Sequence, residues 1–236
     1  IDVRPEIFSF LFLGWYLFVL FRKSGLKLIW TLPIAQLLWV NTHIYFFIGP
    51  LIFLLFFIGE WAKNHQFPSR LLIVGLAVGL ANFINPFGWQ GALYPLFIFK
   101  NYGYPIVENQ GPFFLKAWGY PWLTTYALFI GIIFTAVSFI FNSQNFKKNI
   151  FEFLFFVVSM VLAFKMIRNY PIFAFTMLPI SLRNFCQAKY GIGGRNWSLV
   201  LVLFLAVLIF SVMTNQIYEE ANLGKRFGLI LPEGAQ

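Results

Sequence analysis

Eight apolar runs, each bounded by charged residues or by proline and glycine, constrain this chain more than any other feature of its sequence. A helix needs about 20 mainly apolar residues to cross the hydrocarbon core of a bilayer. The 236 residues are 60% apolar and 11% charged, against roughly 45–50% and 25% in soluble domains. A soluble core does not absorb that excess, so the sequence predicts an all-α, polytopic transmembrane helix bundle. The predicted helical elements are residues 7–21, 28–40, 44–59, 71–84, 122–141, 150–164, 171–182 and 198–216.

Two of these elements, 28–40 and 171–182, are shorter than a full span. Each must tilt little, enter the membrane only partly, or include flanking residues. An alternative joins residues 28–58 into one long helix, but Pro33, the triplet Asn41-Thr42-His43 and a later Gly-Pro pair interrupt it. We therefore favour two helices joined by a tight turn at the triplet.

The fourth run is followed by Asn85-Pro86-Phe87-Gly88-Trp89, which is typical of a helix end. Beyond it we predict a short amphipathic helix that lies in the membrane interface. Its apolar side contains Leu93, Leu96 and Phe97, and its polar side contains Gln90 and Lys100. The aromatic-rich loop 100–121 that follows is either a functional loop or part of an aromatic belt at the lipid headgroups.

The distribution of Lys and Arg predicts the orientation. Successive loops alternate between the two sides of the membrane. Ten of the 17 basic residues lie on one side, in loops 22–27, 60–70, 142–149 and 183–196, although these loops are the shorter set. By the positive-inside rule this side is cytoplasmic. The predicted location is therefore the cell membrane, with both ends of the chain extracytoplasmic, and we expect both ends to continue in a longer protein.

Polar residues within or beside membrane spans are costly and usually face a cavity or a partner. In this topology they gather at the outer ends of the helices, whereas the cytoplasmic ends carry mainly solvated basic residues. We take this one-sided concentration as the candidate site. It comprises Asp2, Arg4 and Glu6 before the first run, Asn41 and His43 at the turn, Asn82 and Asn85 after the fourth run, and Lys165, Arg168 and Asn169 after the sixth.

The chemistry of this set suits an anionic lipid headgroup. Arg4 and Arg168 would hold a phosphate or pyrophosphate through charge-assisted bonds. The acidic residues, Asn41 and His43 would bind hydroxyl groups or transfer protons. A purely structural interpretation also stands for each group, because prolines, amides and carboxylates commonly start helices and cap turns.

Other functional classes are disfavoured by composition and motif. The net charge of +9 comes from few acidic residues and not from a basic cluster, so we expect no nucleic-acid partner. The single cysteine, Cys186, forms no intramolecular disulfide, and no Cys/His spacing predicts a metal site. No nucleotide-binding or hydrolase motif occurs, so no cofactor is expected.

Four segments together carry a family resemblance. They are Asp2-Val3-Arg4-Pro5-Glu6, Leu38-Trp39-Val40-Asn41-Thr42-His43, Asn85-Pro86-Phe87-Gly88-Trp89 and Arg168-Asn169-Tyr170-Pro171-Ile172-Phe173-Ala174. Their succession resembles a group of bacterial membrane proteins related to GT-C-type glycosyltransferases. The ending from Phe227 to Ala235 is similar to the point where that group enters an extracytoplasmic C-terminal domain. We thus expect a transmembrane bundle over 1–216 and the start of such a segment over 217–236.

The resemblance implies a glycosyltransferase that moves a sugar from a polyprenyl-phosphate donor to an acceptor on the extracytoplasmic face. In that superfamily the catalytic acidic residue lies in the first outer loop, after a span that precedes the region matched here. Asp2 is the candidate for that residue in this chain. The implied partners are a membrane lipid and the lipid-linked donor. The substrate-binding candidates are Arg4, Glu6, Asn41, His43, Asn85, Arg168 and Asn169.

A different class also fits an outward polar cavity: a lipid or solute transporter, a flippase or a membrane assembly scaffold. Transporters commonly show internal repeats and binding sites near the midplane of the membrane. This sequence shows no such repeat, and its polar groups cluster at one surface. These observations favour a lipid site that opens at one surface of the membrane over a transport site near the midplane.

Overall fold

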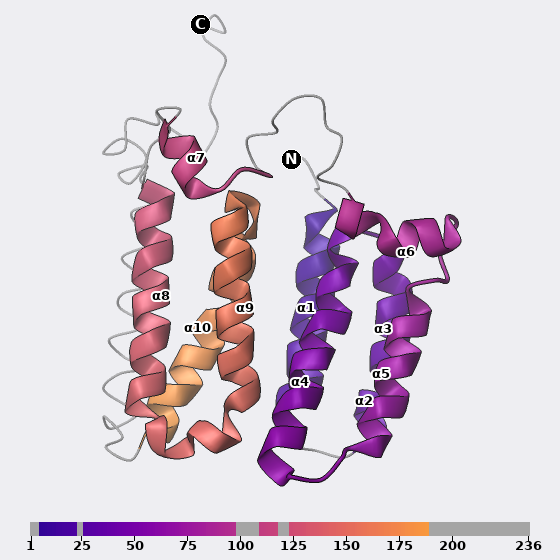
Figure 1. Cartoon of the computed structure of the whole chain (residues 1–236), viewed down its shortest axis with the longest axis horizontal. Coiled ribbons are helices and arrows are strands. Elements are labelled where there is room, and N and C mark those ends of the chain that lie inside the picture. Colours follow the sequence, from indigo (N-terminus) through magenta and orange to yellow (C-terminus); the bar gives the residue numbers. More distant parts are fainter. Residues whose placement is uncertain (1–4, 23–25, 98–108, 118–122, 189–236) are drawn as a thin grey trace, which may run out of the picture. The chain divides into compact units, whose positions relative to one another are not determined.

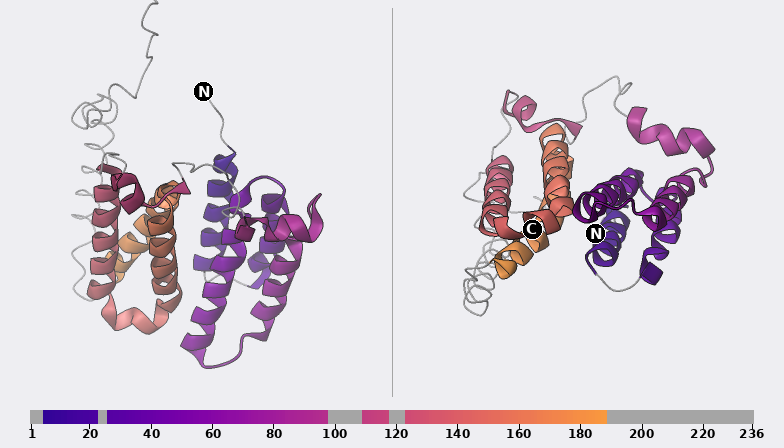
Figure 2. Two further views of the ribbon diagram at one scale, coloured as in Figure 1. Left: turned by 45° about the horizontal axis from the view of Figure 1, so that its top comes forward. Right: turned by 60° about the horizontal axis from the view of Figure 1, so that its bottom comes forward.

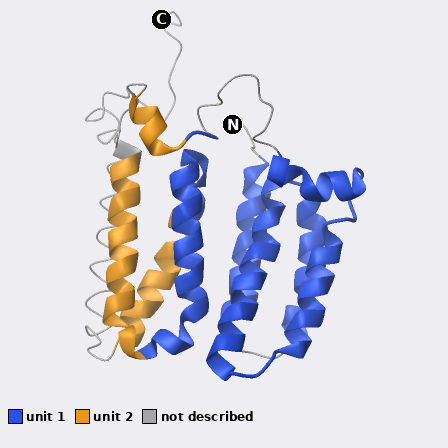
Figure 3. Ribbon diagram, in the orientation of Figure 1, with its two compact units in different colours: residues 1–110, 145–173 blue, residues 111–144, 174–236 orange. Residues whose placement is uncertain are grey.

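The computed structural model describes residues 5–22, 26–97, 109–117 and 123–188. Every regular element in these ranges is a helix and none is a strand, which confirms the all-α class (Figures 1 and 2). The helices divide into two compact units (Figure 3). Unit 1 comprises residues 1–110 and 145–173, and unit 2 comprises 111–144 and 174–236. The predicted run 198–216 and the segment 217–236 lie outside the described residues.

Unit 1 is built from helices that place their apolar faces against one another. Helix α3 packs on α1 and α5, and α4 packs on α5 and α9. The largest buried side chains include Leu13, Tyr16, Leu32, Trp39 and Ile52. The elements are α1 (Glu6–Phe21), α2 (Leu26–Ile29), α3 (Thr31–Val40), η1 (Ile44–Phe47), α4 (Ile48–Asn64), α5 (Ser69–Ala81), α6 (Gly88–Phe97), α9 (Ile150–Lys165) and η4 (Ile167–Asn169).

The predicted turn between the second and third runs is confirmed, and the single long helix over 28–58 is absent. Pro33 lies in the first turn of α3, where the missing N–H removes no helical hydrogen bond. Helix α3 ends at Val40, and a turn follows at Asn41 and Thr42. His43 is extended, and the next helical turn begins at Ile44. The chain therefore reverses at the polar triplet.

A buried hydrogen-bond network joins α1, α3, η1 and α5. The Gln36 side chain is completely buried and accepts a bond from Tyr16 Oη at 2.8 Å. Its amide nitrogen donates to Phe46 O at 2.9 Å and to Asn82 Oδ1 at 2.6 Å. Asn82, predicted to belong to the outer polar set, thus serves the interior of unit 1. Since buried polar groups are costly unless bonded, this network specifies how the four elements pack.

Helix α6 begins after the Asn85 turn, as the sequence predicts. It runs across the direction of α4 and α5 and not alongside them (Figures 1 and 2). It exposes Trp89, Tyr94, Leu96 and Phe97. The predicted helix is therefore present, but Gln90 of its predicted polar side and Leu96 and Phe97 of its predicted apolar side are all exposed. Lys100 lies outside the described residues, and the position of α6 at a membrane interface stays a prediction.

Unit 2 contains α7 (Pro112–Ala117), α8 (Leu123–Phe141), the first part of η3 (Ser143–Lys148) and most of α10 (Tyr170–Gln187). Polar pairs form a ladder between α8 and α10. Ser181 Oγ donates to Thr135 Oγ1 at 3.1 Å, and Asn184 Nδ2 donates to Ser138 Oγ at 3.1 Å. Asn142 Nδ2 donates to Asn184 Oδ1 at 3.0 Å. The predicted end of the seventh run, at residue 182, was too early, because α10 continues to Gln187.

Helix length and apolar character identify one candidate membrane span among the described residues. It is the continuous helical run Ile44–Asn64, which has 21 residues. Shorter apolar helices cover Glu6–Phe21, Lys27–Val40, Ser69–Ala81 and Thr125–Phe141. Large apolar side chains are exposed along these helices, among them Leu11, Ile34, Leu80, Ile130 and Ile140.

Candidate functional site

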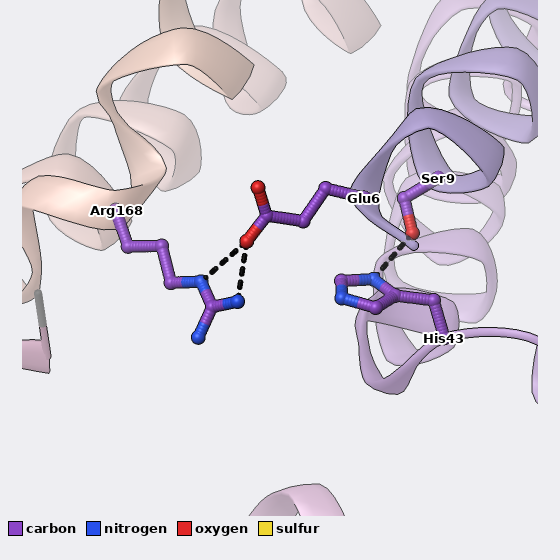
Figure 4. Close-up of polar contacts among 4 residues, drawn as sticks. All are labelled: Glu6, Ser9, His43 and Arg168. Atoms are coloured by element: carbon purple, nitrogen blue, oxygen red, sulfur yellow. Dashed lines mark hydrogen bonds and ion pairs between the residues drawn. The ribbon is translucent and has the colours of Figure 1, made fainter. Parts of the chain in front are cut away.

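An ion pair connects the start of α1 with the end of α9. Glu6 is the first residue of α1, and Arg168 lies in η4, directly after α9. Arg168 Nε donates to Glu6 Oε1 at 2.9 Å, and Arg168 Nη2 donates to the same oxygen (Figure 4). The side chains of Arg168 and Glu6 are 32% and 23% exposed, so solvent reaches the pair. Both residues were predicted to bind substrate, but the sequence did not indicate that they bind each other.

Backbone and side-chain hydrogen bonds hold the turn that contains Arg168. Ile167 N donates to Gln110 O at 3.1 Å, and Asn169 N donates to Met166 O at 3.1 Å. The Asn169 side chain is buried and donates to Leu162 O at 2.8 Å. Asn169 therefore shapes the turn that presents Arg168.

A second pair, Ser9 and His43, lies beside Glu6. Ser9 follows Glu6 by three residues, so the two side chains lie on the same face of α1. Ser9 Oγ and His43 Nδ1 share a hydrogen bond of 2.7 Å. Trp39 Nε1 donates to Ser9 Oγ at 2.9 Å. Glu6 lies between Arg168 and the Ser9–His43 pair (Figure 4).

Tyr45 contacts both halves of the site. The ring centres of His43 and Tyr45 are 4.9 Å apart in an edge-to-face arrangement. Arg168 Cζ lies 5.7 Å from the centre of the Tyr45 ring, within the range of a cation–π interaction. Glu6, Ser9, His43, Tyr45 and Arg168 thus form one cluster, called the Glu6–Arg168 cluster below.

The electrostatic environment keeps His43 neutral. Burial lowers the pKa of His43 below its ordinary value, and the positive charge of Arg168 lowers that pKa further. Glu6 opposes these effects by raising the pKa. Since an ordinary histidine titrates near pH 6.5, a lowered pKa leaves the imidazole uncharged at neutral pH.

Two other amides predicted to bind substrate hold backbone turns. Asn41 Nδ2 donates to Leu37 O at 2.8 Å and to Ile84 O at 2.9 Å. Asn85 Nδ2 donates to Asn82 O at 2.8 Å and to Gly88 O at 2.9 Å. These bonds are typical of structural caps. Asp2 and Arg4 lie outside the described residues.

Three residues of this region were not predicted to belong to the site: Ser9, Trp39 and Tyr45. A signal existed for each, because Ser9 is one turn after Glu6, while Trp39 and Tyr45 flank the polar triplet. Among residues 5–22, 26–97, 109–117 and 123–188, no group of three or more His, Cys, Asp or Glu side chains is placed to hold a metal ion.

Fold and site together define an all-α protein in which an ion pair and a neutral histidine meet at the ends of three helices. No protein-family model, curated protein or solved structure matches the chain.

Proposed function

We propose that this chain is the membrane-embedded part of a GT-C-like glycosyltransferase. It moves a sugar from a polyprenyl-phosphate donor to an acceptor at the extracytoplasmic face. In this proposal the helices form a polytopic bundle with both ends of the chain extracytoplasmic. The large apolar side chains exposed along the helices of both units support a lipid environment, because lipid-facing helices turn such side chains to the acyl chains. Leu80 and Ile140, for example, are 66% and 70% exposed.

The observation that carries the proposal is the convergence of Glu6, His43 and Arg168. The sequence predicts that their segments share one outer level, from the charge distribution alone. The cluster lies where α1 begins, where the chain leaves α3 for η1, and where α9 ends. A lipid headgroup can reach a solvent-accessible cluster at helix ends without crossing the acyl chains.

Arg168 is the proposed phosphate ligand. A guanidinium binds carboxylates and phosphates through the same planar set of donors. Glu6 Oε1 takes the place on Arg168 that a phosphate oxygen would take. We therefore propose that the donor phosphate exchanges with Glu6 on Arg168. Partial exposure of both side chains supports this exchange, because solvent and a ligand can reach the pair.

In the proposed reaction an acceptor hydroxyl attacks the anomeric carbon of the sugar. The bond from that carbon to the phosphate oxygen breaks, and the polyprenyl phosphate leaves with the bonding electron pair. The hydroxyl proton passes to a carboxylate, for which Asp2 is the candidate. Arg168 stabilises the charge that develops on the leaving phosphate.

The test is transfer of label from polyprenyl-phosphate sugars by the full-length protein in lipid vesicles. We expect transfer or hydrolysis with at least one donor, and a loss of turnover in Arg168→Ala. The matched control is Arg22→Ala, because Arg22 directly follows the last residue of the helix that Glu6 begins, and its guanidinium lies over the Phe18 ring. Wild-type turnover in Arg168→Ala would remove the role of Arg168. Neither transfer nor hydrolysis with any donor would favour the flippase or scaffold.

A further inference from the structure

The hydrogen bonds around Ser9 determine which nitrogen of His43 carries the proton. The Trp39 indole has a donor and no acceptor, so its bond to Ser9 uses a lone pair of the Ser9 oxygen. The Ser9 hydroxyl hydrogen then needs an acceptor. His43 Nδ1, at 2.7 Å, is the acceptor that the described residues offer.

The other protonation states of His43 are disfavoured by the same geometry. A proton on Nδ1 would point at Ser9 Oγ and leave the hydroxyl hydrogen without an acceptor among the described residues. Ser9 is only 4% exposed, so water does not readily compensate for the lost bond. The doubly protonated imidazolium has the same defect, and burial together with the charge of Arg168 opposes its charge more than Glu6 favours it.

We propose that Trp39 and Ser9 are positioning residues that hold His43 as its Nε2–H tautomer, so that His43 donates a hydrogen bond to a phosphate oxygen bound beside Arg168. The Nε2 atom lies on the side of the ring that faces Glu6 and Arg168 (Figure 4). In this state His43 is a ligand for an anionic oxygen and not a general base, because the Nε2 lone pair is occupied by the proton. The phosphate ligand rests on the proposed function, whereas the tautomer does not.

Nitrogen NMR of the full-length protein, labelled with ¹⁵N only in histidine, tests the tautomer directly. The chain has two histidines, and His65→Asn removes the second signal. Asn suits that position, because His65 has a left-handed backbone with φ of 53°. We expect an attached proton at Nε2 and a pyridine-type shift at Nδ1 of His43. A proton at Nδ1, or at both nitrogens near neutral pH, would overturn the proposal.

Variants of Ser9 test the positioning role. Ser9→Ala should mix the two tautomers, and Ser9→Thr, which keeps the hydroxyl, should restore the Nε2–H form. An unchanged His43 spectrum in Ser9→Ala would overturn the role of Ser9. If Ser9→Ala does not fold, the spectrum of the wild-type protein still decides the tautomer.

Ligand binding tests the donor role. A polyprenyl phosphate in lipid vesicles should shift the Nε2 signal, and inorganic phosphate shows whether the phosphate group alone suffices. His43→Ala should weaken binding of the polyprenyl phosphate about 10-fold to 100-fold, as expected for a hydrogen bond to a charged group. His43→Gln, whose amide also donates, should keep most of the affinity. Equal losses in both variants, or no shift with either phosphate, would overturn the donor role.

The two proposals fail in distinguishable ways. An Nε2–H tautomer without sugar transfer from any donor refutes the proposed function alone. Sugar transfer by a protein whose His43 carries its proton at Nδ1 refutes this inference alone.

Discussion

The close approach of the Gln36 and Tyr16 side chains to Gly49 of α4 allows a sharp test of the packing in unit 1. A Cβ atom on Gly49 would overlap Gln36 Oε1 and lie 3.1 Å from Cζ and Oη of Tyr16. Gln36 has little freedom to move away, because it is fully buried and bonded to Tyr16, Phe46 and Asn82. We therefore expect Gly49→Ala to displace Gln36 and to break its bond with Tyr16.

The size of the effect follows from two contributions. Overpacking a well-filled core costs about 1–3 kcal/mol, and loss of a neutral hydrogen bond adds about 1 kcal/mol. The free energy of unfolding should therefore fall by about 2–4 kcal/mol. For a chain of this length that corresponds to a fall in Tm of roughly 4–16 °C. The measurement is thermal or detergent-induced unfolding of the full-length protein in a fixed lipid and detergent mixture.

Gly79→Ala is the matched control. Gly79 is also helical, and a Cβ there would meet nothing within 4 Å. Helix propensity alone should make this variant more stable by about 0.5–1 kcal/mol. A double-mutant cycle of Gly49→Ala with Gln36→Ala should show coupling of about 1–3 kcal/mol, because the second change removes the overlap. Equal stability of the Gly49 and Gly79 variants, or additive effects in the cycle, would refute the close approach of the Gln36 side chain to Gly49.

Three further predictions concern the cluster and the topology. The folded-state pKa of His43 lies below the unfolded value of about 6.5. The contribution of neutral His43 to the free energy of unfolding should therefore be complete above about pH 6.5, and it should be lost as the pH falls through the folded-state pKa. Stability curves of the wild type and His43→Gln at several pH values check this, and parallel curves would contradict it. Glu6→Gln removes the carboxylate that competes for the guanidinium, so affinity for a polyprenyl phosphate should rise about twofold to fivefold, whereas an unchanged or lower affinity in vesicle-binding assays argues against exchange. On a Cys186→Ala background, a membrane-impermeant thiol reagent added to intact cells should label Phe87→Cys and not His65→Cys, and the reverse pattern would invert the predicted orientation.

Much of the secondary structure was predictable from local sequence. The runs 7–21, 71–84, 122–141 and 150–164 correspond to helices α1, α5, α8 and α9, with ends within a few residues. Apolar residues, helix-breaking prolines and turn-forming amides act on their immediate neighbours, so a single sequence records their effects. The turn at Asn41–His43 was predictable for the same reason.

The buried polar networks were not predictable in this way. Gln36 is an isolated polar residue within an apolar helix, and its side-chain partner Asn82 lies 46 residues away. Nothing local to either residue indicates the pairing. Similarly, Asn184 was expected in a loop, but it lies within α10, and its side chain bonds to Ser138 of α8 and to Asn142.

The candidate site was likewise predictable only in part. By itself the sequence determined which residues stand at helix ends, since a costly polar group is tolerated where an apolar run stops. The tertiary structure alone decided that Arg168 meets Glu6, 162 residues earlier in the chain, and that Ser9 and Trp39 orient His43. The physical reason is that helix propensity and hydropathy act along the chain, whereas ion pairs and hydrogen bonds between helices depend on how whole faces pack.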